Sequence, residues 1–175
     1  MLVPLSQIET LYKKLHSYLK YAMTADRYVI IRKLNITKKM IKNGSDNGKI
    51  FMRLHNLEKK LNQSIKNRLH RKADIPKTIY PELLPILTKK DEIVESIKRH
   101  QVVVITGETG SGKTTQIPKM CIEAGRGIDG MIGCTQPRRI ATTTVSRRIA
   151  EEIGEELGKS VGYKIRFDDR SNRGN

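Results

Sequence analysis

Residues 102–114 have the sequence Val-Val-Val-Ile-Thr-Gly-Glu-Thr-Gly-Ser-Gly-Lys-Thr, and this stretch decides the expected fold. Its first part, Val102 to Thr106, is a short apolar and β-branched run, which is typical of a strand buried on both faces of a parallel sheet. Its second part matches the pattern G-x-x-x-x-G-K-[ST], a phosphate-binding loop of the Walker A type. A buried strand, a glycine-rich loop and a following helix together predict an α/β domain that binds a nucleoside triphosphate.

The loop pattern gives a role to each of its residue types. Glycines allow successive backbone N–H groups to point at one concave site, and the following helix directs its positive end at the phosphates. Lys113 is expected to reach the β- and γ-phosphates and the Thr114 hydroxyl to bind Mg²⁺, so these two are the predicted catalytic residues. The residues predicted to bind ATP in this region are Gly107, Glu108, Thr109, Gly110, Ser111, Gly112, Lys113, Thr114 and Thr115.

The segment after the loop adds a second expected strand and a pair of arginines. Residues 130–135 predict a short strand, and Arg138 and Arg139 follow its end. Ligands lie beyond the carboxyl ends of parallel strands, where two guanidinium groups suit the phosphate oxygens of a bound nucleic-acid strand. A helix is expected over about 140–157, and alternating apolar residues over 161–167 predict a strand with one buried face.

Three of these stretches resemble motifs I and Ia and the next strand of DEAH-box RNA helicases. They are residues 107–118, 135–139 and 161–167, and the lead-in at 80–85 is similar to the bacterial HrpA type in particular. The resemblance covers about residues 75–170 and includes Pro118, an unusual residue so early in a helix because proline lacks a backbone donor.

The resemblance implies a RecA-like fold and an ATP-dependent RNA helicase with ATP and Mg²⁺ as cofactors. Carried over by position, it implies that Gly107 to Thr114 bind the triphosphate and that Arg138 and Arg139 touch the RNA backbone. It also implies that Arg148 stacks on the nucleotide base. A P-loop kinase or transport ATPase is a weaker interpretation, because the arginine pair and the strand after it are not explained by it.

Most of the net positive charge lies in the first 72 residues, well before the glycine-rich loop in the sequence. The net charge of the chain is +16, and residues 1–72 hold 17 Lys or Arg against 4 Asp or Glu. Such a concentration predicts an anionic partner, with RNA first, DNA as its alternative and an acidic membrane surface second. A solvated helical surface that only keeps the protein soluble is the competing interpretation.

Periodic apolar residues predict three helices in this basic segment, packed as a small antiparallel bundle. The first is expected at a capping box of Ser6 and Glu9, the second over about 25–42, and the third after Asn47-Gly48. Tyr12, Tyr18, Tyr21 and Tyr28 lie among the basic residues, and their helical spacing favours packing over stacking on bases.

The expected domains are a basic helical module (1–72), a proline-rich connector (73–87) and an incomplete RecA-like ATP-binding domain with a parallel sheet (88–175). Pro76, Pro81 and Pro85 disfavour regular helix in the connector. Thr88 is expected to cap the next helix.

Hydrolysis of ATP also needs a strand that ends in Asp-Glu, to hold Mg²⁺ and orient the attacking water. The nearest candidate, Phe167-Asp168-Asp169, follows a strand interrupted by Lys164 and Arg166, so it is a poor match for a central strand. We therefore expect an N-terminal fragment of a longer helicase that is inactive alone. The alternative function is a nucleic-acid-binding and nucleotide-binding fragment that hydrolyses nothing.

The remaining features indicate an ordinary cytoplasmic protein. No apolar run approaches the roughly 18 residues of a membrane span, and no secretory signal is evident. A monomer is expected, with Cys121 and Cys134 as free thiols that pack in the core. The four histidines have no ligand-like spacing, so metal binding by them is not expected.

Overall fold

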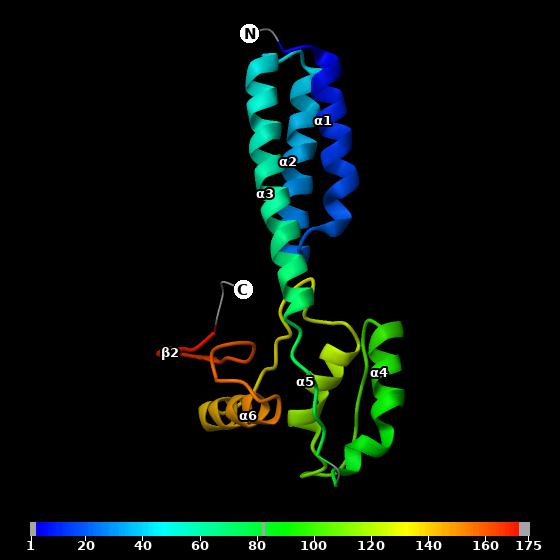
Figure 1. Cartoon of the computed structure of the whole chain (residues 1–175), viewed down its shortest axis with the longest axis vertical. Helices are drawn as coiled ribbons and strands as arrows, with labels where there is room; N and C mark the ends of the chain where they lie inside the picture. The colour runs from blue at the N-terminus through cyan, green and yellow to red at the C-terminus, as the bar shows by residue number, and fades with distance from the viewer. Residues whose placement is uncertain (1–2, 82, 172–175) are drawn as a thin grey trace. The chain divides into compact units, whose positions relative to one another are not determined.

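Helices form most of the first 73 residues in the computed structural model, which describes residues 3–81 and 83–171. Figure 1 shows the three long helices of this segment side by side. The elements are α1 (Leu5–Tyr18), the 3-10 helix η1 (Leu19–Tyr21), α2 (Thr24–Lys42) and α3 (Asn47–Ala73). The three predicted helices are therefore present, and each begins within one or two residues of the expected position.

Local residues explain where these helices begin and end. After α2 the chain turns at Gly44, whose φ of 66° suits glycine. The Asp46 carboxylate then accepts the backbone N–H of Lys49 at 2.7 Å, which satisfies a free donor of the first turn of α3. The predicted capping box at Ser6 is wrong, because α1 begins one residue earlier, after an extended Pro4 whose carbonyl accepts the first N–H groups.

An apolar core runs along the three helices. The stripe predicted on α3 faces it, and the side chains at its centre are almost fully buried. The buried residues of this core are Ile8, Leu15, Leu19, Ala22, Ile30, Leu34, Ile50, Leu54, Leu57 and Leu61. Burying ten such side chains is the main stabilising contribution in this bundle, since each large aliphatic side chain gives roughly 1.5–3 kcal/mol.

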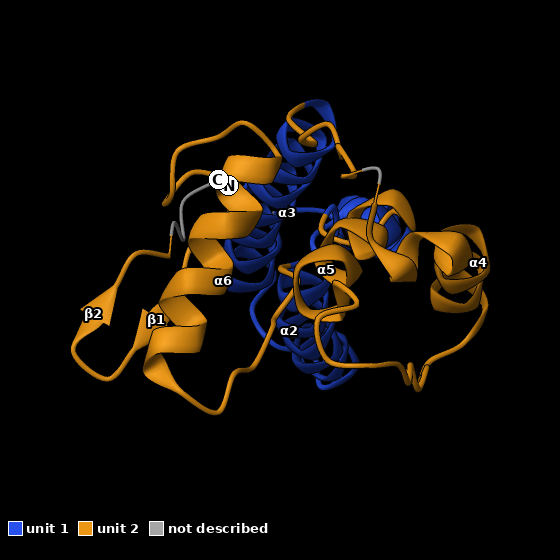
Figure 2. Cartoon of the chain, turned by 90° about the horizontal axis from the view of Figure 1, so that it is seen from below, with its two compact units in different colours: residues 1–73, 128–130 blue, residues 74–127, 131–175 orange. Residues whose placement is uncertain are grey.

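Residues 128–130 belong to the same compact unit as residues 1–73, as Figure 2 shows in blue. The Asp129 carbonyl accepts the N–H of Thr24 at 2.9 Å, and its carboxylate accepts Nε of Arg68. Beside it, the buried Ser64 hydroxyl accepts the N–H of Met23 at 3.0 Å and donates to Asp26 at 2.6 Å. These bonds satisfy backbone groups where η1 leads into α2.

The exposed tyrosines correct the expectation that all four pack. Tyr12 does pack against the bundle core. Tyr18, Tyr21 and Tyr28 are 48%, 46% and 71% exposed, because the buried stripes of α1 and α2 are filled by aliphatic residues instead.

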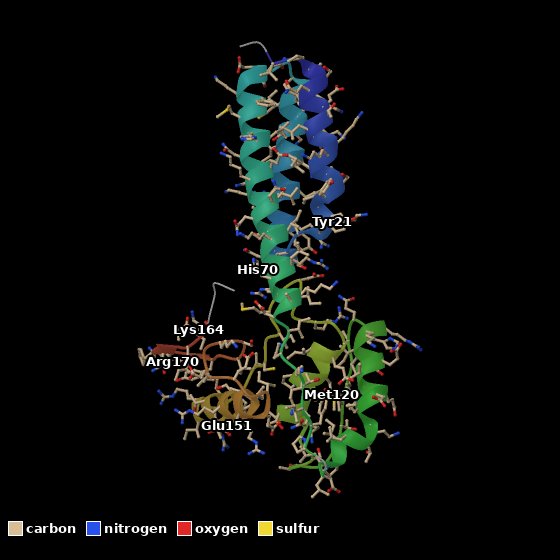
Figure 3. All side chains as sticks on the ribbon, in the orientation of Figure 1. Tyr21, His70, Met120, Glu151, Lys164 and Arg170 are labelled. Carbon is tan, nitrogen blue, oxygen red and sulfur yellow. The ribbon has the colours of Figure 1, made fainter. Side chains whose placement is uncertain are left out.

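The second compact unit comprises residues 74–127 and 131–175, of which the structure describes all but 82 and 172–175. Its core joins the first helices of the unit, with Met120 (labelled in Figure 3) in one cluster with Ile86, Ile93 and Val94. Its elements are η2 (Pro85–Lys89), α4 (Lys90–Arg99), α5 (Lys113–Glu123), α6 (Arg139–Glu152), β1 (Lys164–Ile165) and β2 (Asp168–Asp169). Thr88 does not cap α4, because Pro85 starts a 3-10 turn and the Thr88 hydroxyl donates back to the Pro85 carbonyl.

The predicted parallel sheet is absent from the described residues. The strands expected at 102–106 and 130–135 form no ladder, and the one sheet there pairs β1 with β2 in antiparallel register, Lys164 opposite Asp169. Val102 and Val104 are 78% and 84% exposed, so the expectation of burial on both faces is wrong for this chain. A parallel strand needs hydrogen-bonded neighbours within about 4.8 Å and a covering layer on each face. Among the described residues this segment has no paired strand, and only Ile105 packs against the core cluster of this unit.

The described helices include none that is both long and apolar enough to cross a membrane.

Candidate nucleotide-binding site

The glycine-rich loop leads directly into the first turn of α5. Gly110 and Gly112 have φ angles of 85° and 93°, the left-handed region that favours glycine. Gly112 is the residue before the helix, and its carbonyl accepts the N–H of Gln116 at 2.9 Å. The two glycines thus turn the chain so that α5 begins at Lys113.

Lys113 holds the loop closed around its own ammonium group. Its Nζ donates to the carbonyl oxygens of Gly107 and Glu108, each at 2.6 Å, and lies 3.2 Å from Oγ of Ser111. The first turn of α5 carries no acidic residue. A lysine and the positive end of a helix therefore lie together, which is the arrangement that favours an anion.

The interior of the loop is kept open by Gly107. A Cβ atom there would lie 3.5 Å from Oγ of Ser111 and 3.8 Å from Nζ of Lys113, inside the curl of the chain. Any larger residue would fill the space beside the ammonium group. The Lys113 ammonium group beside this position is one that could bind a phosphate oxygen.

The neighbouring threonines differ in their surroundings. Thr115 is half-buried; its hydroxyl donates to the Gly112 carbonyl at 3.3 Å and accepts Nε2 of Gln116 at 2.9 Å. Thr114 is exposed at the start of the helix. Of the two, Thr114 is the residue whose hydroxyl is open to a cation, and a hydroxyl oxygen suits the hard ion Mg²⁺.

The 3-10 turn η2 and the residue before it pack against the glycine-rich loop. The backbone N–H of Ile86 donates to the Ser111 carbonyl at 3.2 Å. A Cβ atom on Gly112 would lie 3.0 Å from Cδ1 of Leu84 and 3.3 Å from Cγ2 of Ile86. Glycine is therefore required at 112 for its backbone angle and for this close packing.

A buried polar cluster joins α5 to α6. Lys119 is fully buried, and its Nζ donates to Oε2 of Glu152 at 2.5 Å and to the Ile79 carbonyl at 2.6 Å. Gln116 is also fully buried and donates to the same carboxylate oxygen at 2.9 Å. Sequence reasoning missed all three side chains, since their partners lie more than 30 positions away and leave no local pattern.

Arg148 belongs to this cluster. It lies on α6, is exposed, and donates from Nε to Oε1 of Glu152 at 2.7 Å. Burial of the Glu152 carboxyl opposes ionisation, but the hydrogen bonds from Lys119, Gln116 and Arg148 outweigh it and hold the pKa of Glu152 below its ordinary value. Arg148 on α6 and the residues Gln116 and Lys119 on α5 thus share one hydrogen-bond partner, the Glu152 carboxylate.

Arg138 and Arg139 lie at the start of α6 and are both exposed. The first turn of this helix has no acidic residue, so two cations lie at the positive end of a helix without a carboxylate in that turn. Cations are disfavoured there by a few tenths of a kcal/mol to about 1 kcal/mol each. A bound anion would offset this unfavourable electrostatic interaction.

The only paired carboxylates near the end of the described chain are already engaged. Lys164 and Arg170, labelled in Figure 3, lie on the β1–β2 hairpin and form ion pairs with Asp169 and Asp168 at 3.1 and 3.6 Å. The Tyr163 hydroxyl also donates to Asp168 at 2.6 Å. The described residues contain no group of three or more His, Cys, Asp or Glu placed to hold a metal ion.

The two cysteines carry free thiols. Partial burial of the thiol groups raises the pKa of both, which keeps them protonated at neutral pH, even though Cys134 as a whole residue is exposed. Cys134 is exposed as a residue, so the expectation that it packs in the core is wrong.

Comparison with known proteins relates the chain to one kind of enzyme. Over 147 residues (84% of the chain) it is 47% identical to the ATP-dependent RNA helicase HrpA of Escherichia coli, and over 91 residues (52%) it is 56% identical to the ATP-dependent RNA helicase HrpA homolog of Haemophilus influenzae. The chain spans 11% and 7% of the length of these relatives. No protein-family model matches it. The resemblance to the HrpA type is confirmed by these identities.

Proposed function

We propose that this chain, a relative of HrpA-type helicases, is the ATP-binding portion of an ATP-dependent RNA helicase. The observation that carries the proposal is the loop of Gly107 to Thr114 around the Lys113 ammonium, at the start of α5, within a chain 47% identical to a protein of that name. Either feature alone is less specific, since phosphate-binding loops occur in many kinds of ATPase.

Lys113 is the residue on which nucleotide binding depends in this proposal. Phosphate oxygens are stronger acceptors for an ammonium group than neutral carbonyls, so they would replace the Gly107 and Glu108 carbonyls as its partners. The loop amides and the positive end of α5 then stabilise the remaining phosphate charge. Mg²⁺, when bound with ATP, supplies further charge neutralisation, and Thr114 is the residue we assign to hold it.

Arg138 and Arg139 are proposed to contact the phosphate backbone of RNA. Their support is the unbalanced positive charge at the start of α6 and the position of the pair in the HrpA-like segment. Arg148 is the proposed contact for the nucleotide base. Because Glu152 already holds its guanidinium edge at 2.7 Å, the planar face is the part left to stack on a base.

A second candidate function applies to the chain as a separate polypeptide. It would bind nucleotide and RNA without hydrolysing ATP, and the observation that favours this is the engagement of Asp168 and Asp169 within a hairpin. Carboxylates bound to Tyr163 and Lys164 are poorly placed to hold Mg²⁺ and orient water.

Titration calorimetry with Mg-ATP tests the first proposal directly. Lys113→Ala should abolish measurable binding, whereas Lys89→Ala, an exposed lysine on η2, should leave the affinity unchanged. Unchanged ATP affinity in the Lys113 variant would show that the loop is not the nucleotide site. The second proposal is tested by release of phosphate from ATP in the presence of RNA: the chain alone should show none, and RNA-stimulated release would contradict it.

A further inference from the structure

A groove on the helical bundle is lined by several basic residues, together with apolar ones. It has a volume of about 690 Å³ and lies between Lys33 in the middle of α2, Asp46 before α3 and the first half of α3. We call it the α2–α3 groove and define it by the residues that line it, of which the polar ones are Lys33, Asp46, Lys49, Arg53, Asn56 and Lys60.

The cations of the groove form a track along one helix. Lys49, Arg53, Asn56 and Lys60 are spaced by four, three and four positions, so they lie on one face of α3. At 1.5 Å per residue the track from Lys49 to Lys60 is about 16 Å long, which exceeds the reach of one phosphate group. Figure 3 shows nitrogen-tipped side chains along α3.

These cations form no ion pair in the described part of the chain. None of the ion pairs there involves Lys33, Lys49, Arg53 or Lys60, although other bundle residues such as Lys14 and Glu58 do pair. The one carboxylate in the lining, Asp46, accepts the N–H of Lys49 as a helix cap. Four cations against one occupied carboxylate leave a net positive track.

Arg53 provides an independent indication of a missing acceptor. Its Nε is buried, yet no acceptor for that N–H lies within hydrogen-bonding distance among the described residues. A buried donor without an acceptor is uncommon in folded proteins and costs about 1–3 kcal/mol. An anion in the groove would supply the acceptor once the guanidinium group turned toward it.

We propose that the α2–α3 groove binds the phosphate backbone of RNA, at a second contact separate from the nucleotide loop. The choice of RNA as the polyanion rests on the proposed function. The shape of the bundle favours it over an acidic membrane, because the apolar face of α3 is buried in the bundle core and cannot insert into lipid. Met52, a lining residue that is 60% exposed, offers an apolar contact for a base or ribose.

Two matched triple variants of the whole chain test this proposal. The first replaces the groove lysines, Lys33, Lys49 and Lys60, by glutamine; the second replaces Lys13, Lys39 and Lys59, which lie outside the groove lining. Both lose the same charge, and glutamine keeps helix propensity, so circular dichroism should show the helices intact. Binding is measured by fluorescence anisotropy with a labelled single-stranded oligouridine over a range of salt concentrations.

The groove triple should bind the RNA about tenfold more weakly, and its slope of log affinity against log salt should fall by about 2. The matched triple should lose much less. A second pair of variants tests Arg53. Arg53→Met should lower the affinity for RNA, and Arg53→Lys should lower it less, because lysine keeps the positive charge but lacks the planar set of donors of the guanidinium group.

Equal losses in both triples would overturn the proposal, since binding would then follow net charge alone. Binding to vesicles of phosphatidylcholine and phosphatidylserine that depends on the groove lysines, with no RNA binding, would overturn it in favour of a membrane. Lys113→Ala should leave groove-dependent RNA binding intact while ATP binding is lost. If the groove variants behave like the wild type but ATP binding still requires Lys113, only the groove assignment fails.

Discussion

The Lys119 ammonium group donates to the Glu152 carboxylate at 2.5 Å, and the Lys119 side chain is fully buried. The pair joins α5, which follows the glycine-rich loop, to α6, which begins at Arg139. Removing one partner of a buried ion pair leaves an uncompensated charge, which is costlier than removing both. Helices α5 and α6 are therefore joined by an ion pair whose loss should cost less stability when both residues are replaced than when only one is.

Glu152→Ala should destabilise the second compact unit by about 3 kcal/mol, because Lys119 would be buried without its counter-ion. The double variant Lys119→Met and Glu152→Met should recover much of that loss, since both charges are gone and the apolar side chains fill similar space. Hydrogen–deuterium exchange of the α5 and α6 amides measures both effects. Equal exchange in the single variant and the wild type would contradict the role given to the pair.

The same carboxylate should make stability depend on pH. The pKa of Glu152 is lowered on folding, so its contribution is present above the unfolded value of about 4.5 and is lost as the pH falls through the lower folded value. Glu152→Gln removes this titration. The difference in amide protection between wild type and variant should be largest near neutral pH and shrink below about pH 4.5; a constant difference would assign the pH dependence to other groups.

Gly112→Ala should destabilise the loop for two reasons. An L-residue at a φ of 93° costs about 1–2 kcal/mol, and the added Cβ would press on Leu84 and Ile86. Gly125→Ala is the matched control, because Gly125 has a φ of 82° but open space around its Cβ position. The Gly112 variant should lose about 1 kcal/mol more stability than the control in urea unfolding, and equal losses would mean that the packing of η2 on the loop is unimportant.

Ser64→Ala should weaken the helical bundle by about 1–3 kcal/mol. The Ser64 hydroxyl is the acceptor for the backbone N–H of Met23 and also donates to Asp26, so alanine leaves a partly buried donor unpaired. Ser17→Ala provides the control, because the exposed Ser17 hydroxyl only donates to the Lys14 carbonyl in the same helix. Thermal unfolding followed by circular dichroism should separate the two variants, and coincident melting curves would contradict this account.

The helices of the bundle were predictable because their signals are local. Apolar residues at helical spacing marked all three helices, and Asn47-Gly48 marked the start of α3 to within two residues. The glycine-rich loop was predictable for the same reason, since its pattern lies within eight consecutive residues. The helix start at Lys90 was misplaced because Pro85 favours a 3-10 turn, and the expected cap at Thr88 then bonds within that turn.

The sheet and the buried cluster depend on distant residues and were not predictable in the same way. Val102 and Val104 are β-branched and apolar, yet burial needs neighbouring strands that a local run cannot supply. Lys119 is charged, and its position directly before Met120 does not by itself indicate that the ammonium group is buried. Its environment is set by Ile79, 40 positions earlier, and Glu152, 33 positions later.

The self-closed loop has a kinetic consequence. Because Lys113 already donates to the Gly107 and Glu108 carbonyls, the loop is folded without a ligand, and a triphosphate that bound there as we propose would exchange one set of acceptors for another. Little ordering entropy then remains to be lost on association, so related nucleotides should enter at similar rates and differ mainly in how long they stay. Residence time, rather than rate of encounter, is the quantity through which this loop would discriminate among them.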